Sequence, residues 1–358
     1  MPLLLYLATA LAVLALVHSF VAPISRAAAV LLIVLPLAVV GHALVTGGVY
    51  GPVDHVYQYQ PHAALAERFG IGPARNVSVA DMWSEFFPWR LAVQESFARG
   101  EWPLWNAYNL AGHPLAAEAQ AAPYSPFTLI ACLLPAAVSM TYTAAIALFL
   151  AGVCAFVFAR ELGLGEGASC VAAAGWALSS CIVLSSLTAL GFATLYAPLI
   201  LAAVRRVVRR PGLHAGAVLM TALALSTLAG HPESLFLNVL VGCAYALFEL
   251  LRRRARPWRA IATAVAAGTM AFLLCAIFLL PILDALPQSH EYQMKSEALT
   301  HVTHGLPIAN VLALFATHFF PFLQNRAWLS PQLGYIGGEI AAMGSIVVAL
   351  ALYAVWRR

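Results

Sequence analysis

Two carboxylates stand four residues apart in the polar segment that follows the first apolar part of the chain. Asp81 and Glu85 would share one face of a helix, because side chains at i and i+4 are neighbours on a helical surface. Carboxylates are among the side chains that transfer protons when a protein holds them beside a reacting group. The spacing predicts two carboxylates at the water–lipid boundary, facing a helix bundle.

An apolar stripe follows the first carboxylate. Ser78 and Asp81 are typical of a helix start, since serine can cap a helix and a negative charge is favoured at the positive helix end. Pro88 would remove one backbone hydrogen bond, so we predict either a kink there or a helix that begins near it. Apolar residues recur at three- or four-residue spacing, as in a helix lying in the membrane interface: Met82, Phe86, Trp89, Val93 and Phe97.

The next segment is dense in Gly, Pro, Trp and Asn, which fix turns and offer flat apolar faces with polar edges. Its candidate binding residues are Trp105, Asn106, His113 and Gln120. One interpretation is an interfacial loop anchored by its tryptophans. The other is a loop that binds carbohydrate or lipid phosphate, because aromatic faces stack on sugar rings and Asn or His bonds hydroxyl groups.

Two further polar positions lie at the ends of apolar stretches. His231 and Glu233 sit between two apolar helices, where polar groups are costly unless they face a cavity or each other. His231 and Glu233 are therefore either a buried structural pair or part of a binding site. Asp284 lies where a later helix ends, and such a residue is usually only solvated. Its convergence with Asp81 and Glu233 on one face makes it a candidate.

The elements that carry these residues are predicted to be membrane helices. The chain has 358 residues, of which 62% are hydrophobic and 9% charged, with a mean hydropathy of +0.84. Soluble domains carry roughly 25% charged residues. The apolar residues form blocks of about 20, the length of a membrane span, and such blocks must be helical in lipid. All six cysteines lie in or beside apolar stretches without a CxxC spacing, so neither a disulfide framework nor a thiolate metal site is expected.

The predicted fold class is therefore all-α: one transmembrane domain over 1–358 with about nine spans. We expect a long first outer loop at 48–126 that carries interfacial helices and the site, and a second outer loop at 284–334. Residues 127–135 are apolar but too short to cross, and indicate a re-entrant or interfacial piece. The spans are expected near 2–22, 28–47, 138–160, 168–188, 191–205, 213–229, 234–251, 260–283 and 335–356.

Charge sets the orientation. Short loops rich in arginine stay in the cytoplasm. In this arrangement most of the 19 basic residues fall on one side, which is therefore inside: Arg26, Arg160, Arg205, Arg206, Arg209, Arg210, Arg252, Arg253, Arg254, Arg256, Arg259, Arg357 and Arg358. Both long loops and the N-terminus are then outside, with most of the acidic residues. We expect a multi-pass protein of the bacterial inner (plasma) membrane whose active face is periplasmic or extracellular.

Taken together, these motifs resemble the first outer loop of the YfhO-like bacterial membrane proteins, within the GT-C class of glycosyltransferases. The resemblance covers roughly 80–340, and its specificity lies in the combination. It rests on Asp81, Pro88-Trp89-Arg90, Gly100-Glu101-Trp102-Pro103-Leu104-Trp105-Asn106, Gly112-His113-Pro114, Gln120, Tyr124-Ser125-Pro126, Gly230-His231-Pro232-Glu233 and Gly334-Tyr335-Ile336-Gly337.

The resemblance implies transfer of a sugar from a polyprenyl-phosphate donor to an envelope acceptor, with inversion at the anomeric carbon. Asp81 matches the position that serves as catalytic base or orients the acceptor. Arg90 is the nearest cation for the leaving phosphate, while His113, His231 and Glu233 would supply ligands or hydrogen bonds. A divalent metal ion is an open possibility. Membrane lipid is the other expected partner, and nucleic acid is not.

Three features depart from that family's pattern. Asn106 is followed by alanine where relatives have proline, an extra helix precedes the loop, and the chain has about nine helices where relatives usually continue. Two other functions stay open: a transporter or flippase for lipid-linked substrates, which would place polar residues in helix middles, and a scaffold, in which Asp81 would tolerate replacement. The sequence has no Walker loop, GxSxG elbow or HExxH motif, which argues against ATPase, serine-hydrolase and zincin functions.

Overall fold

The structure is a computed structural model that describes residues 1–74, 80–109, 111–253, 257–290 and 292–293. Within these ranges the chain is all-helical and contains no strand, only one isolated bridge in a loop. The predicted helix 335–356, the candidate Tyr335, Ser78 and nearly all of the second outer loop lie outside the described residues.

The N-terminal region forms one straight helix and one broken helix. α1 spans Pro2–Phe20, as expected. The predicted helix 28–47 is divided into α2 (Arg26–Val34) and α3 (Leu37–Thr46), whose axes differ by 70°. Pro36 lies at the break, where its ring cannot donate the backbone hydrogen bond that a continuous helix needs.

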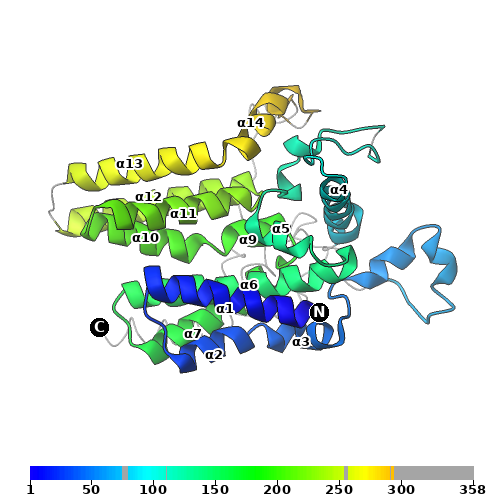
Figure 1. The fold of residues 1–358 in the computed structure, drawn as a ribbon, viewed down its shortest axis with the longest axis horizontal. Helices are drawn as coiled ribbons and strands as arrows, with labels where there is room; N and C mark the ends of the chain where they lie inside the picture. Colours follow the sequence, from blue (N-terminus) through cyan, green and yellow to red (C-terminus); the bar gives the residue numbers. More distant parts are fainter. Residues whose placement is uncertain (75–79, 110, 254–256, 291, 294–358) are drawn as a thin grey trace, which may run out of the picture.

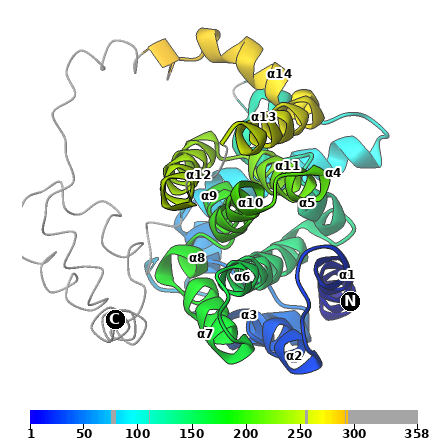
Figure 2. The ribbon, with the colours of Figure 1, turned by 90° about the vertical axis from the view of Figure 1, so that its left-hand side faces the viewer.

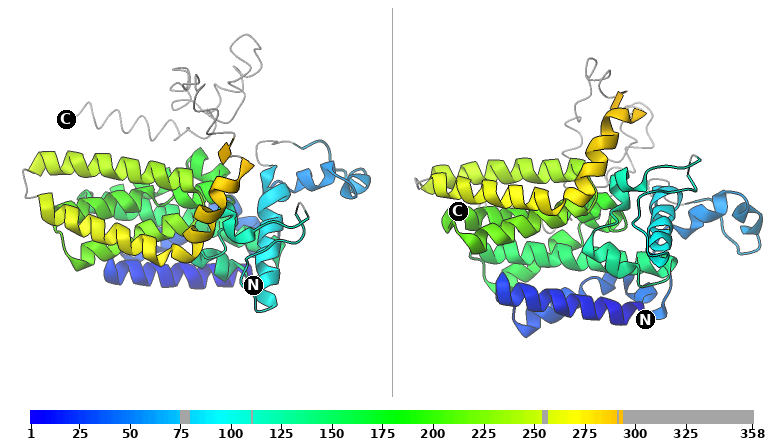
Figure 3. Two further views of the ribbon diagram at one scale, coloured as in Figure 1. Left: turned by 90° about the horizontal axis from the view of Figure 1, so that it is seen from above. Right: turned by 45° about the horizontal axis from the view of Figure 1, so that its top comes forward.

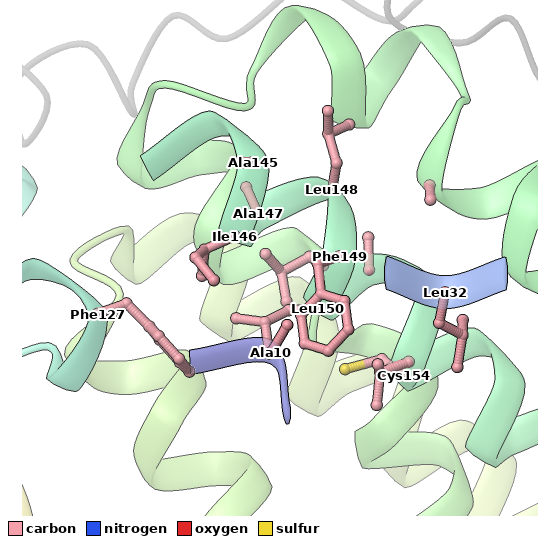
Figure 4. Packing of buried hydrophobic residues seen from close by; sticks show 14 of the residues in the cluster. Ala10, Leu32, Phe127, Ala145, Ile146, Ala147, Leu148, Phe149, Leu150 and Cys154 are labelled. Atoms are coloured by element: carbon pink, nitrogen blue, oxygen red, sulfur yellow. The ribbon is translucent and has the colours of Figure 1, made fainter. Parts of the chain in front are cut away.

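α6 (Ala136–Glu161) is the central helix of the bundle (Figure 1). It packs against α1, α3 and α7, so its side chains are buried on all sides, which its uniformly apolar sequence allows. Figure 4 shows Ala10 of α1 and Leu32 of α2 packed around Phe149 and its neighbours on α6. The few polar groups in this core have partners: the hydroxyl groups of Thr9 and Tyr142 lie 3.0 Å apart.

The next two predicted helices are also interrupted. The predicted helix 168–188 consists of α7 (Glu166–Ala177) and the short α8 (Ser180–Leu184). The predicted helix 191–205 consists of α9 (Ala189–Thr194) and α10 (Ala197–Arg209), which together run over a length sufficient for one span. At the break between α7 and α8, the Ser179 side chain bonds the backbone carbonyl of Trp176, which competes with helical continuation.

The remaining helices are α11 (Leu213–Leu228), α12 (Pro232–Arg253), α13 (Pro257–Leu274) and α14 (Ala276–Ala285). The predicted helix 260–283 is interrupted at Cys275, after which α14 turns away from α13 (Figure 1). α10 and α11 lie between the core around α6 and the outer pair formed by α12 and α13, as Figure 2 shows.

Five described helices are long and apolar enough to cross a membrane, and a sixth is added if α2 and α3 count as one bent span. These five are Pro2–Phe20, Ala136–Glu161, Ala189–Arg209, Pro232–Arg252 and Pro257–Leu274. The lengths and composition of these helices are those of an integral membrane protein, as the sequence predicts.

The long helices run between two chemically different ends of the bundle (Figure 1). We call them the loop end, where α1 begins and the segment 48–126 lies, and the arginine end, where α10 and α12 finish and α13 begins. At the arginine end, buried Glu249 of α12 pairs with Arg205 and Arg209 of α10. Arg206 pairs with Glu161 of α6 at 2.7 Å.

The two ends provide a test of orientation. In a cysteine-free background, a membrane-impermeant thiol reagent added outside intact cells should label Glu67→Cys at the loop end but not Leu213→Cys at the arginine end. Both positions are exposed in the structure, so accessibility in the fold does not decide the result. Labelling of Leu213→Cys alone would show that the loop faces the cytoplasm.

Candidate functional site

Helix α4 (Phe87–Ala98) organises the polar loop. It begins beside Pro88, which lies in the first turn where no backbone hydrogen bond is lost, so the predicted alternative of a helix starting near Pro88 is confirmed. A π-helical turn, η4 (Met82–Phe86), precedes it. Figure 3 shows α4 lying crosswise at the loop end of the bundle, as an interfacial helix would. Its apolar stripe packs on the loop segment 115–121 through buried Trp89 and Val93.

Three carboxylates gather near the start of α4. Asp81 flanks η4, is exposed, and makes no side-chain capping bond there. Partial burial raises the pKa of Glu85 above its usual value, and the negative charges of Asp81 and Glu118 raise it further. The same loop brings His113 to Glu118, with 3.5 Å between Nε2 and Oε2. The structure therefore brings together the predicted residues Asp81, Glu85 and His113, and adds Glu118.

Arg90 of α4 is a buried cation whose guanidinium lies against α6. Its side chain is 9% exposed, and its Nη1 donates to the hydroxyl oxygens of Ser139 and Thr143 on α6, at 3.4 and 3.3 Å. No described carboxylate forms an ion pair with it. Burial lowers the pKa of the guanidinium, but an arginine side chain keeps its charge in proteins.

A small polar cavity of about 30 Å³ adjoins Arg90. Predicted binding residue Gln120 lines it, together with Ser125 and Thr188. This volume matches roughly one water molecule's share of liquid water, so the cavity as it stands holds only a very small polar group. A larger anion would reach Arg90 only if the loop residues around the cavity moved apart.

The turn between Asn106 and His113 is held by the backbone. Asn106 N donates to His113 O at 2.8 Å, and His113 N donates to Asn106 O at 2.9 Å. The buried Asn106 side chain accepts a bond from Tyr108 N at 3.0 Å. A Cβ at Gly112, whose φ is +117°, would lie 2.5 Å from the Trp105 ring, so the ring rests directly on this turn. The Asn106 side-chain oxygen thus helps to hold the turn.

An aromatic hollow of about 530 Å³ lies on the outer side of this turn. Trp102, Trp105 and Tyr108 line it and are more than half exposed. The charged side chains of the hollow bond one another. Arg99 pairs with Glu95 at 2.8 Å and with Glu101 at 3.0 Å. The Tyr108 hydroxyl donates to Glu95 Oε1 at 3.0 Å. Aromatic faces beside charged and hydroxyl groups form a surface suited to a sugar ring.

The sequence motifs predict Trp105 as a binding residue, but not the other residues of the hollow: Trp102, Tyr108, Glu95 and Arg99. Glu95 and Arg99 could have been predicted as a pair, because they lie one helical turn apart near the end of α4. The hollow and the carboxylates lie at opposite ends of α4, about 20 Å apart along a helix that rises 1.5 Å per residue. The connection between them runs through the Asn106–His113 turn and the His113–Glu118 contact.

Two later elements pack on the same loop. Gly230 has a φ of +88°, and a Cβ there would lie 2.3 Å from the carbonyl oxygen of Ala119, so the turn between α11 and α12 touches the loop backbone. α14, which carries Asp284, packs against the segment 115–117. Both elements therefore contact the loop segment at the loop end of the bundle.

The candidates on these elements have different surroundings. His231 Nδ1 accepts a bond from Ser234 N at 3.1 Å and so caps α12; burial lowers its pKa, against the opposing charge of Glu233. Glu233 and Asp284 are exposed. The polar cavity is lined by Arg90 and Gln120, and the hollow by Trp105 and Asn106, whereas Asp81, His231 and Asp284 line neither.

Gly230→Ala should destabilise the fold by about 1–3 kcal/mol, because the added Cβ meets a backbone oxygen and the backbone conformation disfavours alanine. Thermal unfolding in detergent measures this. Gly167→Ala in α7 is the matched control, since a Cβ there meets nothing within 4 Å. Equal melting temperatures for the two variants would show that the Gly230 turn does not pack closely against the Ala119 backbone.

No group of three or more His, Cys, Asp or Glu side chains within the described part of the chain is arranged to hold a metal ion. Among these residues, therefore, no set of three such side chains is placed to bind the divalent ion that the resemblance allows. No protein-family model, curated protein or solved structure matches the chain.

Proposed function

We propose that this chain is a membrane glycosyltransferase of the GT-C class, similar to the YfhO-like proteins. It would transfer a sugar from a polyprenyl-phosphate donor to an acceptor of the cell envelope. The observation that carries the proposal is Arg90: a guanidinium nine-tenths buried at the loop end, with hydroxyl partners but no described carboxylate. Burying an unpaired charge is costly, so a phosphate from a ligand is the natural partner.

The carboxylates near the start of α4 supply the second half of the chemistry. The acceptor hydroxyl would give its proton to Asp81 as its oxygen attacks the anomeric carbon. The bond from that carbon to the phosphate oxygen breaks, and the lipid phosphate leaves with the bonding electrons toward Arg90. Attack opposite the leaving group inverts the anomeric configuration. Glu85, whose pKa is raised, is the nearby second acid.

The aromatic hollow gives the acceptor or the donor sugar a place to bind. Trp102, Trp105 and Tyr108 offer exposed faces, and the Glu95–Arg99 pair offers hydrogen bonds to hydroxyl groups. The Asn106–His113 turn and the His113–Glu118 contact connect the hollow to Glu85, so an extended carbohydrate would follow the loop from one to the other.

The proposal includes the finer topology. Nine spans follow if α2 with α3, α7 with α8, α9 with α10, and α13 with α14 each cross once, and if 335–356 adds the last. The loop end then faces the periplasm or the exterior of a bacterial inner (plasma) membrane, and the arginine end faces the cytoplasm. The acceptor would be an envelope polymer, lipid or protein.

Membranes containing the chain should transfer radiolabelled sugar from a polyprenyl-phosphate donor, whereas membranes without it should not. Trp105→Ala should raise the KM for one substrate severalfold with little change in kcat. The reason is that stacking on a sugar ring stabilises the bound substrate and the transition state equally. Phe69→Ala, an exposed aromatic elsewhere in the loop, is the control. Absence of transfer by correctly inserted protein over a panel of donors and acceptors would contradict the proposal and favour the scaffold or transporter functions.

A further inference from the structure

An apolar groove runs along the outer face of the bundle, away from the site at the loop end. α12 and α13 each pack on α10 and α11, and Figure 2 shows both on the side of these two helices that faces away from α6. The space between them has a volume of about 530 Å³, within the range of ligand pockets. Apart from Thr227 and Cys243, its lining is apolar. The Thr227 hydroxyl is already bonded to Leu223 O at 2.8 Å, so the groove offers little to a polar ligand.

The groove extends between the two ends of the bundle. Val208, Leu250 and Ile261 line it at the arginine end, and Leu235, Leu279 and Leu283 line it at the loop end. On α13 the lining runs from Ala260 to Phe272, about 18 Å, which is more than half the hydrocarbon thickness of a bilayer. A Cβ at Gly268, midway along α13, would meet nothing within 4 Å, so the middle of the groove is open. An extended hydrocarbon chain fits this shape.

Charge distinguishes one end of the groove from the other. Arg210, Arg252 and Arg259 are exposed on the helix ends that line it at the arginine end. None of the three forms an ion pair among the described residues, because the nearby acids Glu249 and Glu161 pair with other arginines. These cations are therefore available to an anion at the mouth of an apolar groove.

Trp258 indicates the depth of the groove mouth in the membrane. It is 62% exposed beside Arg259, whose guanidinium lies 5.7 Å from the centre of its ring. Exposed tryptophan and arginine at a helix end are typical of the boundary between lipid tails and headgroups. The cations thus lie at headgroup level, and the groove lies at the level of the tails.

We propose that this groove binds an anionic phospholipid from the leaflet at the arginine end, with an acyl chain between α12 and α13 and the phosphate near Arg210, Arg252 and Arg259. Basic pockets between membrane helices bind acidic headgroups in this way. The proposal does not depend on sugar transfer, because it concerns the opposite end of the bundle from Asp81 and Arg90.

Native mass spectrometry of the purified chain tests this with phosphatidylglycerol and with phosphatidylcholine of the same acyl chains. Phosphatidylglycerol should bind preferentially. Replacing Arg210, Arg252 and Arg259 by glutamine should weaken its binding by about fivefold per arginine, roughly 100-fold in all, and leave phosphatidylcholine binding unchanged. Gly268→Phe, which fills the groove, should weaken binding of both lipids.

Arg26→Gln is the matched charge control, since Arg26 begins α2, which lies on the opposite side of the bundle (Figure 2) and starts at the arginine end (Figure 1). It should bind both lipids as the unchanged protein does. Equal affinity for the two lipids, or wild-type affinity of the triple variant for phosphatidylglycerol, would overturn the proposal. So would unchanged phospholipid binding in Gly268→Phe, or displacement of phosphatidylglycerol by polyprenyl phosphate at equal concentration, which would assign the groove to a different occupant.

Discussion

Asp81→Asn is expected to lower the rate of sugar transfer by about 10²–10⁴ while the protein stays inserted and folded. Asparagine preserves the shape of the side chain and can still accept a hydrogen bond, but it cannot take a proton at neutral pH. Asp81 is exposed and makes no capping bond, so the structure assigns its carboxylate no stabilising contact that the amide would lose. The measurement is transfer from a polyprenyl-phosphate donor by membranes that contain equal amounts of each variant.

A purely structural Asp81 would behave differently. Loss of a charge at a helix start costs about 0.3–1 kcal/mol of stability and leaves the chemistry nearly intact. Glu67→Gln, an exposed acid elsewhere in the loop, is the control for a general loss of negative charge. Normal transfer by Asp81→Asn would remove this residue from the mechanism.

Glu85→Gln identifies which carboxylate accepts the proton. Glu85 is close enough to Asp81 for the two charges to interact, and its raised pKa makes it a stronger base than an ordinary glutamate. A large loss of transfer in Glu85→Gln alone would move the base to Glu85. Large losses in both variants would indicate that the pair acts as a unit, in which case the two effects would not add.

Hydropathy predicted the long helices but not their interruptions. The helix over 138–160 was predicted within two residues at its N-terminal end and one at its C-terminal end, because an unbroken apolar block of membrane length has few alternatives. The helix over 28–47 was predicted as continuous, and the structure bends it at Pro36. The average hydropathy of an apolar block is little changed by one proline. The bend arises because proline lacks the backbone N–H that a continuous helix needs.

The site was predictable where spacing carried the information. Asp81 and Glu85 interact as their four-residue spacing requires, and α4 starts beside Pro88. Glu118 was not predicted, because its approach to Glu85 and His113 depends on how the loop folds back on α4. The bond from Tyr108 N to the buried Asn106 side chain, which helps to hold the turn, was not predicted either. Such contacts leave no periodic signal in the chain.

The second large effect is expected at Arg90. Arg90→Met should lower kcat by about 10²–10³, the usual effect of removing one group that stabilises developing charge. Methionine fills a similar space without charge, and its flexible chain suits an irregular site. Single-turnover transfer at saturating donor measures this directly. Arg90→Lys keeps the charge but not the planar fork, so it should retain part of the activity.

The stability of Arg90→Met separates the catalytic and structural roles. If Arg90 served the fold, its removal would destabilise the protein by breaking a buried interaction. In the structure, however, no described carboxylate is left behind, and its two partners keep bonds of their own: Ser139 Oγ donates to Ala136 O at 2.6 Å, and Thr143 Oγ1 donates to Ser139 O at 2.8 Å. Removing an unpaired buried charge should therefore leave the melting temperature unchanged or raise it. A stabilised but inactive variant is the outcome expected of a cation kept for a ligand's phosphate, whereas a destabilised variant with normal transfer would show that Arg90 serves only to hold α4 against α6.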